Sequence, residues 1–245
     1  MKNKQNRLLT LAVALAVGSI TSNVWAQEVC DVAGVPSGTA TDPGDLACGA
    51  GSVASGGYAT ALGSDAQATG NRATALGSHA EATNLGATAI GRYSLASGLY
   101  STATGRLSTA TGDASTANGA FSYATGNNST AIGSYSTASG AGGTATGSFS
   151  EASGVLSTAT GGLSVASGTG STANGAYSTA SGDYSTAVGY ESTASGYASN
   201  ATGQRSNASG NRSSATGSGS TASGNYSTAN GANSTASGDY STANG

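Results

Sequence analysis

Residues 101–107 read Ser-Thr-Ala-Thr-Gly-Arg-Leu, and this seven-residue unit recurs without insertion through most of the 245-residue chain. From Gly56 to Gly245 every seventh residue is glycine except Asn84, and the residue two places earlier is always alanine. A fixed period is typical of a stacked array in which each unit buries its face against its neighbours. Asn replaces glycine best at a positive φ, so Asn84 predicts a backbone role for this position.

The alternation within the unit has the period of a β-strand. Ser and Ala are expected on one side, Thr and the residue after Ala on the other, and Gly with the next two residues turns the chain. Seven residues at about 3.3 Å each cannot close a coil. We therefore predict an all-β fold, a parallel β-solenoid with two seven-residue units in each 14-residue coil.

Alternate units differ, which supports the doubled period. The residue before Gly is only Ser or Thr in one set of units, whereas in the other set it includes apolar residues at multiples of 14. A column restricted to Thr, Asn and aliphatic residues is expected to face a packed partner. We interpret this column as the contact face of an oligomer axis, with these candidates: Leu62, Leu76, Ile90, Ile132 and Val188.

The Thr column splits in the same way. It is almost entirely Thr in the units that carry the apolar residues, whereas in the alternate units it accepts charged, amide and aromatic side chains. A column that accepts such residues is expected to face water. It supplies the first candidates for an exposed binding face: Gln67, Glu81, Tyr123 and Glu151.

The shared Ala and Ser columns are expected to line the interior of a flat roll, whose two sheets approach so closely that only methyl-sized groups fit. A buried CH₂ group contributes about 0.8 kcal/mol, whereas ordering the backbone costs about 1–2 kcal/mol per residue. A lone chain therefore has a thin core. Self-association through the apolar outer column is the expected remedy.

The N-terminus has the features of a secretory signal peptide. Lys2, Lys4 and Arg7 precede an apolar run from Leu8 to Val17, and a small-x-small site follows. The alternative is a membrane anchor, but this run is shorter than the roughly 20 residues that span a bilayer. We assign residues 1–26 to the signal peptide and expect the mature chain to be exported.

Cleavage would leave five arginines against eleven carboxylates, a net charge near 5 − 11 = −6. A nucleic-acid partner requires a clustered basic face, which this sequence lacks. Residues 27–50 hold the two cysteines, Cys30 and Cys48, and in an exported chain a disulfide between them is expected. The alternatives are two free thiols or a metal site. A metal site is far less suitable, because no nearby His or third Cys completes a ligand set. We interpret 27–50 as an N-terminal cap and 51–245 as the repeat array.

One copy, residues 128–136, reads Asn-Ser-Thr-Ala-Ile-Gly-Ser-Tyr-Ser. It resembles the head repeats of YadA-like trimeric autotransporter adhesins, approximately Asn-Ser-Val-Ala-Ile-Gly-x-x-Ser, and the resemblance extends over about Gly51 to Gly245. It implies a left-handed β-roll, a homotrimer about a threefold axis, and display on a bacterial outer membrane. The residues alone give neither the handedness nor the number three.

Two departures from the family pattern matter. Most copies carry Thr or Ser in place of the family's aliphatic pair, so the axial contact is expected to be more polar. The printed sequence also ends within the array, at Gly245, without the stalk and membrane barrel of these adhesins. We interpret it as a fragment of a longer gene, the alternative being a truncated or secreted head; membrane attachment would require that C-terminal anchor.

Catalysis is not expected. His79 is the only histidine, and no acid or nucleophile has a fixed sequence relation to it. Asp113, Asp183 and Asp239 occupy first turn slots without the carboxylate ladder of a calcium-binding repeat, so we interpret them as solvated turn residues. We therefore predict no catalytic residue, metal site or cofactor.

Aromatic residues concentrate in the second turn slot, where Tyr offers a rigid recognition surface. We add Tyr135, Tyr177 and Tyr184 to the exposed binding face; the alternative is that such rings stack on neighbouring coils. The favoured function is an adhesin head that attaches to host matrix, cells or surfaces through multivalent non-covalent contacts. A structural spacer or fibre and an ice-binding surface are the alternatives, and the ligand stays open.

Overall fold

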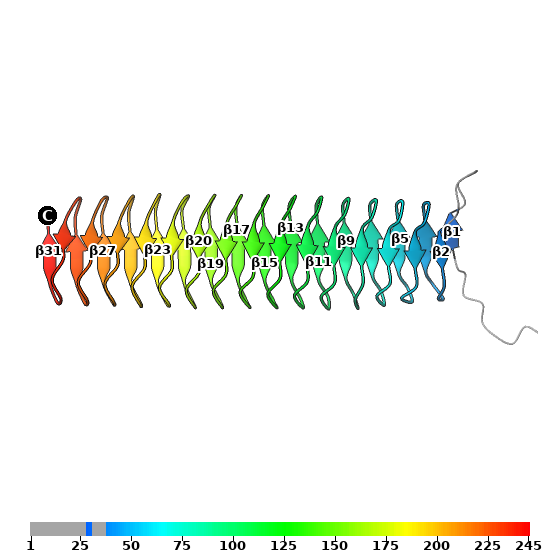
Figure 1. The fold of residues 1–245 in the computed structure, drawn as a ribbon, viewed down its shortest axis with the longest axis horizontal. Helices are drawn as coiled ribbons and strands as arrows, with labels where there is room; N and C mark the ends of the chain where they lie inside the picture. Colours follow the sequence, from blue (N-terminus) through cyan, green and yellow to red (C-terminus); the bar gives the residue numbers. More distant parts are fainter. Residues whose placement is uncertain (1–27, 31–37) are drawn as a thin grey trace, which may run out of the picture.

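The computed structural model describes residues 28–30 and 38–245, with side chains from residue 38 onward. These residues form a long rod in which every regular element is a β-strand, and the chain advances by one coil at a time (Figure 1). None of the described residues belongs to a helix long and apolar enough to cross a membrane. The predicted signal peptide, residues 1–26, lies outside the described residues.

Two parallel sheets run along the rod, and we call them the first and second sheets. Alternate strands of the chain belong to alternate sheets. The first sheet consists of β1 Glu28–Cys30, β3 Leu46–Cys48, β5 Thr60–Leu62, β7 Thr74–Leu76, β9 Thr88–Ile90, β11 Thr102–Thr104, β13 Thr116–Asn118, β15 Thr130–Ile132, β17 Thr144–Thr146, β19 Thr158–Thr160, β21 Thr172–Asn174, β23 Thr186–Val188, β25 Asn200–Thr202, β27 Ser214–Thr216, β29 Thr228–Asn230 and β31 Thr242–Asn244.

The second sheet has shorter strands. It consists of β2 Thr39–Ala40, β4 Val53–Ala54, β6 Gln67–Ala68, β8 Glu81–Ala82, β10 Leu95–Ala96, β12 Thr109–Ala110, β14 Tyr123–Ala124, β16 Thr137–Ala138, β18 Glu151–Ala152, β20 Val165–Ala166, β22 Thr179–Ala180, β24 Thr193–Ala194, β26 Asn207–Ala208, β28 Thr221–Ala222 and β30 Thr235–Ala236.

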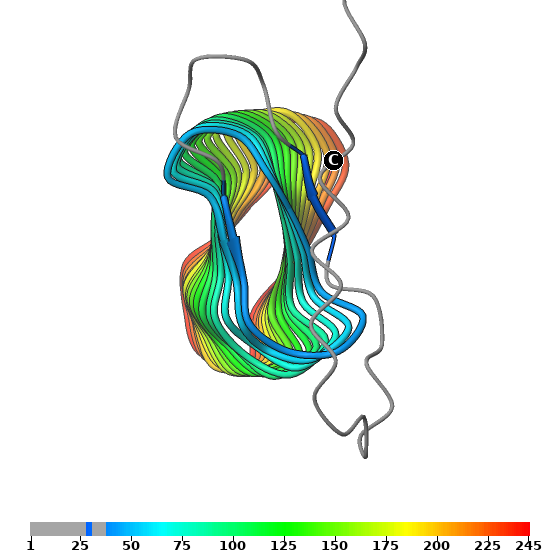
Figure 2. The same cartoon turned by 90° about the vertical axis from the view of Figure 1, so that its right-hand side faces the viewer.

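The register confirms the predicted 14-residue coil. In the first sheet Ala103 pairs with Ala117, and in the second sheet Ala110 pairs with Ala124. The turns are stacked as well, since the Tyr135 N–H donates to the Ala120 carbonyl over 3.0 Å. Viewed along the axis, successive coils therefore lie almost on top of one another, with the two sheets facing each other (Figure 2).

The core consists of small side chains, as predicted. The strand alanines are buried except at the two ends of the rod, for example Ala103, Ala110 and Ala131, and most serines that precede the strands are buried beside them. The Ser hydroxyls before second-sheet strands bond the glycine carbonyl three residues earlier, as from Ser108 to Gly105 over 2.9 Å. Apart from Asp45 near the N-terminal end, the buried side chains between the sheets are no larger than a methyl or hydroxymethyl group.

The glycine column contains two kinds of glycine. Those after first-sheet strands have a positive φ, such as +128° at Gly161. Those after second-sheet strands do not, and they lack a side chain for another reason: a Cβ at Gly70 would collide with the carbonyl oxygen of Asn84 in the next coil. Asn84 belongs to this second kind, so the prediction that it replaces glycine at a positive φ was wrong.

Asn84 instead secures the turn through its amide. Its Nδ2 donates to the Ser97 carbonyl over 3.0 Å, and its Oδ1 accepts the N–H of Leu85 over 2.9 Å. The side chain therefore links two coils and fixes its own turn. Its role is hydrogen bonding rather than backbone conformation.

The turns form two edges of the rod, and we name them by the strand that they follow. The first edge follows first-sheet strands and the second edge follows second-sheet strands. On both edges the residue in the second turn slot is left-handed, with φ of 58° at Tyr135 and 57° at Tyr184. Residues in the same slot therefore belong to two separate columns on two edges.

At the N-terminal end the first pairing departs from the 14-residue coil, because Glu28 of β1 lies opposite Leu46 of β3, 18 residues later. β1 pairs with β3, and the buried carboxylate of Asp45 accepts the N–H groups of Asp42 (3.0 Å) and Ala59 (2.8 Å). The register of β1 and β3 sets the Cα of Cys30 opposite that of Cys48. Neighbouring strands lie about 4.8 Å apart, which falls in the Cα–Cα range of disulfides.

The Cys30–Cys48 disulfide stays a prediction, with a clear test. Reduction, or the substitution Cys48→Ser, is expected to lower the free energy of unfolding by about 3 kcal/mol for a loop of this length. Mass spectrometry of the exported protein should find one linked peptide pair that separates on reduction. Two alkylatable thiols in the oxidised protein would contradict it.

Candidate functional site

The outer face of the first sheet carries the predicted oligomer contact. Leu62, Leu76 and Ile132 are 43%, 39% and 42% exposed, and Ile90 and Val188 are half-buried. The register sets Leu62 beside Leu76, and Leu76 beside Ile90, on three neighbouring strands. This apolar column is therefore continuous over those coils, and among the described residues it stays partly exposed.

The outer face of the second sheet carries the polar candidates. Gln67, Glu81, Tyr123 and Glu151 are all exposed, and Gln67 pairs with Glu81 on the adjacent strand. The first edge leads into each second-sheet strand and the second edge leaves it. The candidate strand residues thus lie on one face, with an edge of turns on either side.

A file of mostly aromatic side chains, which we call the aromatic file, occupies the first edge over eight consecutive coils. Phe121, Tyr135 and Phe149 stack in parallel, with ring centroids 4.8 Å apart. Because the faces of these rings cover one another, mainly their rims are left for solvent. The stacking alternative therefore holds for Tyr135. The complete file is His79, Tyr93, Leu107, Phe121, Tyr135, Phe149, Leu163 and Tyr177.

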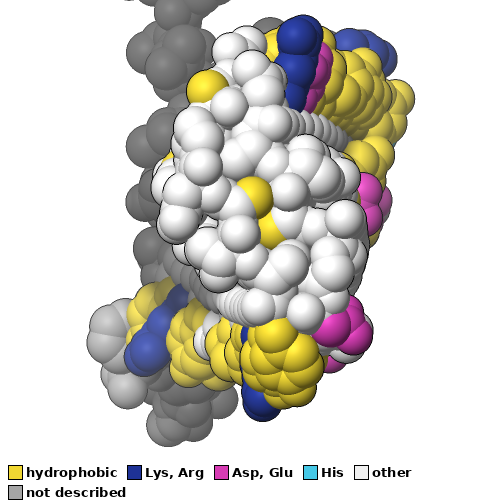
Figure 3. All heavy atoms as spheres, turned by 90° about the vertical axis from the view of Figure 1, so that its left-hand side faces the viewer, with side chains coloured by type: hydrophobic (Ala, Val, Ile, Leu, Met, Phe, Trp, Pro, Cys, Tyr) yellow, Lys and Arg dark blue, Asp and Glu magenta, His cyan; other side chains and the backbone are white. Residues whose placement is uncertain are grey.

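Hydrophobic side chains also gather on the second edge, so the end view shows them at the two opposite turn edges of the rod (Figure 3). Tyr184 lies there, its ring placed so that a Cβ on Gly170 of the preceding coil would be 3.1 Å from it. Tyr184 is nevertheless 59% exposed. The structure therefore separates the tyrosine candidates: Tyr135 and Tyr177 belong to one edge and Tyr184 to the other.

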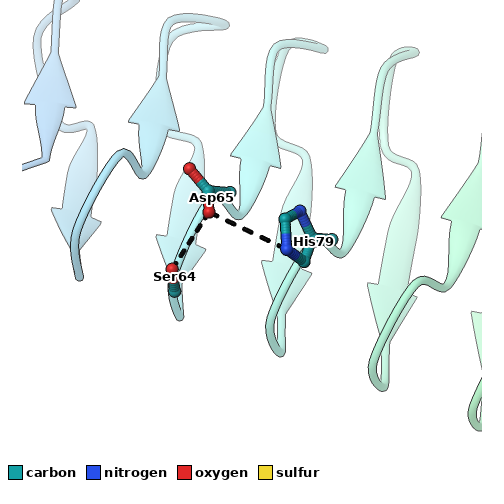
Figure 4. A network of polar contacts seen from close by, with 3 residues as sticks. All are labelled: Ser64, Asp65 and His79. Carbon is teal, nitrogen blue, oxygen red and sulfur yellow. Dashed lines mark hydrogen bonds and ion pairs between the residues drawn. The ribbon is translucent and has the colours of Figure 1, made fainter.

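A small polar network lies on the first edge at the start of this file (Figure 4). His79 Nε2 lies 3.8 Å from Asp65 Oδ2, and the Ser64 hydroxyl donates to the same oxygen over 3.0 Å. The expectation that no acid has a fixed relation to His79 was wrong, because one coil of 14 residues brings Asp65 beside it. The order is unsuited to nucleophile activation, since Ser64 bonds the acid rather than the imidazole.

The aromatic file ends at a charged cluster. Arg205 Nε donates to Glu191 Oε2 over 2.7 Å, and Tyr190 packs edge-on against Tyr177 with centroids 5.7 Å apart. The hydrogen bond from Arg205, followed by that from Tyr190, lowers the pKa of Glu191 below its ordinary value of 4.5. The same carboxylate raises the pKa of Tyr190.

The Glu191 pKa is expected to rise toward its ordinary value in Arg205→Gln, which removes the guanidinium donor and its positive charge. Because the folded-state pKa is depressed, the stability that this pair provides is present above the unfolded-state pKa and is lost as pH falls through the folded-state value. A ¹³C NMR titration of the carboxyl measures this. Arg212→Gln, which lies on the other edge, is the control, and an unchanged Glu191 pKa in Arg205→Gln would contradict the assignment.

Asn and Asp recur in the first turn slot of the second edge, where they form short ladders. In these ladders an Oδ1 atom accepts the backbone N–H of the first-slot residue one coil earlier, as from Leu99 to Asp113 and from Thr169 to Asp183, over 2.9 and 2.8 Å. Asp113, Asp183 and Asp239 are exposed turn residues, as interpreted from the sequence, and each also accepts such a backbone N–H. These carboxylates satisfy backbone donors that a turn would otherwise leave to water.

The sequence analysis overlooked several residues of the second edge that the structure brings together. The sequence analysis did not single out Arg212, Asn211 or Asn225. It treated the aromatic residues of the second turn slot as one column, and it did not compare polar turn residues at a spacing of 14. Sorting the turn slots by edge would have set Tyr226 one coil after Arg212 in the same slot, and Tyr197 one coil earlier in the adjacent slot. The signal was the period already found in the strands.

The chain was compared with curated proteins, with solved structures and with models of protein families. No curated protein matches the sequence. Among solved structures, the chain is similar to the collagen-binding domain of the Yersinia adhesin YadA, with 24% identity over 72% of this chain and 68% of that one, at a TM-score of 0.25. The family model of the YadA head domain repeat matches at residues 44–66, 54–80, 68–94, 82–108, 96–122, 124–150, 152–178, 166–192, 190–206, 208–234 and 222–245.

Proposed function

The chain belongs to the family of the YadA head domain repeat, and from this membership we propose that it is the head of a bacterial cell-surface adhesin. Its role is attachment to host matrix, host cells or other surfaces. The observation that carries the proposal is the run of family matches from residue 44 to residue 245, over a rod whose coils are all of one kind. The family is one of adhesins, not of enzymes.

The division of the surface supports this role. We propose that the apolar outer column of the first sheet packs against other copies of the chain in a homotrimer. That arrangement leaves the second sheet outward, with Gln67, Glu81, Tyr123 and Glu151 exposed along its length. Weak contacts repeated along a rod and over several chains give strong attachment without a deep pocket.

The proposal is tested by attachment of the mature protein, from residue 27 onward, to immobilised fibrillar collagen and to bare polystyrene. Collagen is the first probe because the Yersinia domain is described as collagen-binding. Replacing Gln67, Glu81, Tyr123 and Glu151 together by Ala is expected to weaken attachment at least tenfold, roughly the loss of a few contacts in a multivalent array.

The matched control replaces Tyr100 and Leu156 by Ala, two side chains of the second edge that are 64% and 69% exposed. This control variant should attach as the unmodified protein does. A folded protein that attaches to neither surface would overturn the adhesin proposal and favour a spacer. An equal loss of attachment in both variants would show that the outer face of the second sheet is not the attachment surface.

A further inference from the structure

A groove of about 440 Å³ opens on the second edge, toward the C-terminal end of the described rod. It is lined by turn residues of four consecutive coils, from Tyr197 to Tyr240. Its volume lies within the roughly 300–1,000 Å³ of small-molecule sites. Neither the strand faces nor the aromatic file of the first edge contributes to the groove, so the groove is a separate feature of the surface.

One wall of the groove is a file of planar groups. The guanidinium of Arg212 lies 5.4 Å from the centroid of Tyr226 and 6.0 Å from that of Tyr197. Tyr226 in turn stacks on Tyr240, with centroids 5.1 Å apart and planes within 3°. Arg212 Nη1 also donates to the Tyr226 hydroxyl over 2.6 Å. The wall is therefore held in place before any ligand arrives.

The other wall is the Asn and Asp ladder. Asn211 Oδ1 accepts the Tyr197 N–H over 3.1 Å, Asn225 Oδ1 the Asn211 N–H over 3.2 Å, and Asp239 Oδ1 the Asn225 N–H over 2.8 Å. These bonds fix the orientation of each side chain. The side-chain Nδ2 hydrogens of Asn211 have no partner among the described residues. The same holds for Oδ2 of Asp239 and for Nε and Nη2 of Arg212.

We infer that this groove binds a neutral oligosaccharide. Sugar hydroxyls both donate and accept, and the groove offers fixed donors on Arg212 and Asn211 together with a fixed acceptor on Asp239. The C–H faces of a pyranose ring suit an apolar aromatic wall, since Tyr combines a large rigid area with a hydroxyl. An anionic ligand would meet the Asp239 carboxylate and the overall acidic surface.

The inference goes beyond the proposed adhesin function, because the groove would take a sugar in solution whether or not the rod attaches through its strand face. The chain also contains a matched control. Asn71-Arg72 repeats the dipeptide Asn211-Arg212 in the same turn slots of the same edge. Within the described part of the chain, the Arg72 guanidinium lies over no aromatic ring.

The experiment is saturation-transfer NMR and calorimetry on the whole mature chain, with lactose, cellobiose, maltose and diacetylchitobiose as neutral probes and sialyllactose as the acidic probe. At least one neutral disaccharide is expected to bind. Arg212→Ala should weaken it at least tenfold, roughly the loss of a hydrogen bond to a charged group. Arg72→Ala should leave the affinity unchanged.

Three outcomes would overturn the inference. No binding of any neutral probe at millimolar concentration excludes the site. Equal losses in Arg212→Ala and Arg72→Ala place binding elsewhere. Preference for sialyllactose, strengthened by Asp239→Asn, makes the ligand an anion. Attachment to collagen or polystyrene is measured separately, so the adhesin proposal and the sugar site fail or succeed independently.

Discussion

Gly161→Ala is expected to destabilise the rod by about 3 kcal/mol, whereas Gly162→Ala, one residue later, is expected to stabilise it slightly. Gly161 has a φ of +128°, and a Cβ there would lie 2.7 Å from the carbonyl carbon of Gly175 in the next coil. Both the backbone conformation and the close approach of the next coil therefore disfavour a side chain at position 161. Gly162 has no positive φ, and its nearest neighbour to a Cβ is the Ser148 carbonyl at 3.8 Å.

Thermal and denaturant unfolding followed by circular dichroism measures both effects. The rod is a stacked array, so the change at Gly161 is expected to lower stability most in the coils on either side of it. Amide hydrogen exchange locates that loss. Similar stabilities of the two variants would contradict the view that coil-to-coil contact sets the glycine column.

The second large effect is expected when Leu62, Leu76 and Ile90 are replaced together by Asp. Their neighbouring strands form one apolar patch on the outer face of the first sheet. In a homotrimer this patch is covered, and an unpaired buried carboxylate costs several kcal/mol. The variant should therefore sediment as a monomer, whereas the unmodified protein should sediment as a trimer.

The control for this prediction is Leu95→Asp with Val165→Asp. Both residues are half-buried on the outer face of the second sheet, which is the outward face in the proposed trimer. The control variant should keep the mass of the assembly. Dissociation of both variants, or of neither, would contradict the assignment of the two faces.

The strand part of the fold follows from the sequence because one period determines it. Buried Ala131 and exposed Ile132 alternate as a strand requires, and the spacing of 14 between Leu62 and Leu76 is the register that the sheet shows. An interior that accepts only Ala and Ser allows little variation in the distance between sheets. Sequence reasoning was therefore sufficient for the architecture.

The turns were harder to predict, because a slot in a repeat specifies neither φ nor the neighbour one coil away. Asn84 and Gly161 occupy equivalent slots in the seven-residue unit, yet only Gly161 has a positive φ. His79 and Asp65 are 14 residues apart and were not compared. The groove at Arg212 depends on which side chains follow one another along a single edge. The seven-residue description hides that order.

In the proposed homotrimer, association covers the first sheet and leaves the second sheet outward. Ile132 and Tyr123 test it directly, because in a single chain they are about equally exposed, at 42% and 39%. Ile132→Cys and Tyr123→Cys are each labelled with a maleimide, and the rate at each site is read by peptide mass mapping. We expect fast labelling at position 123 and labelling at least tenfold slower at position 132, because the proposed homotrimer covers position 132. This ratio corresponds to roughly 1.4 kcal/mol of protection. Equal rates at the two positions would contradict it.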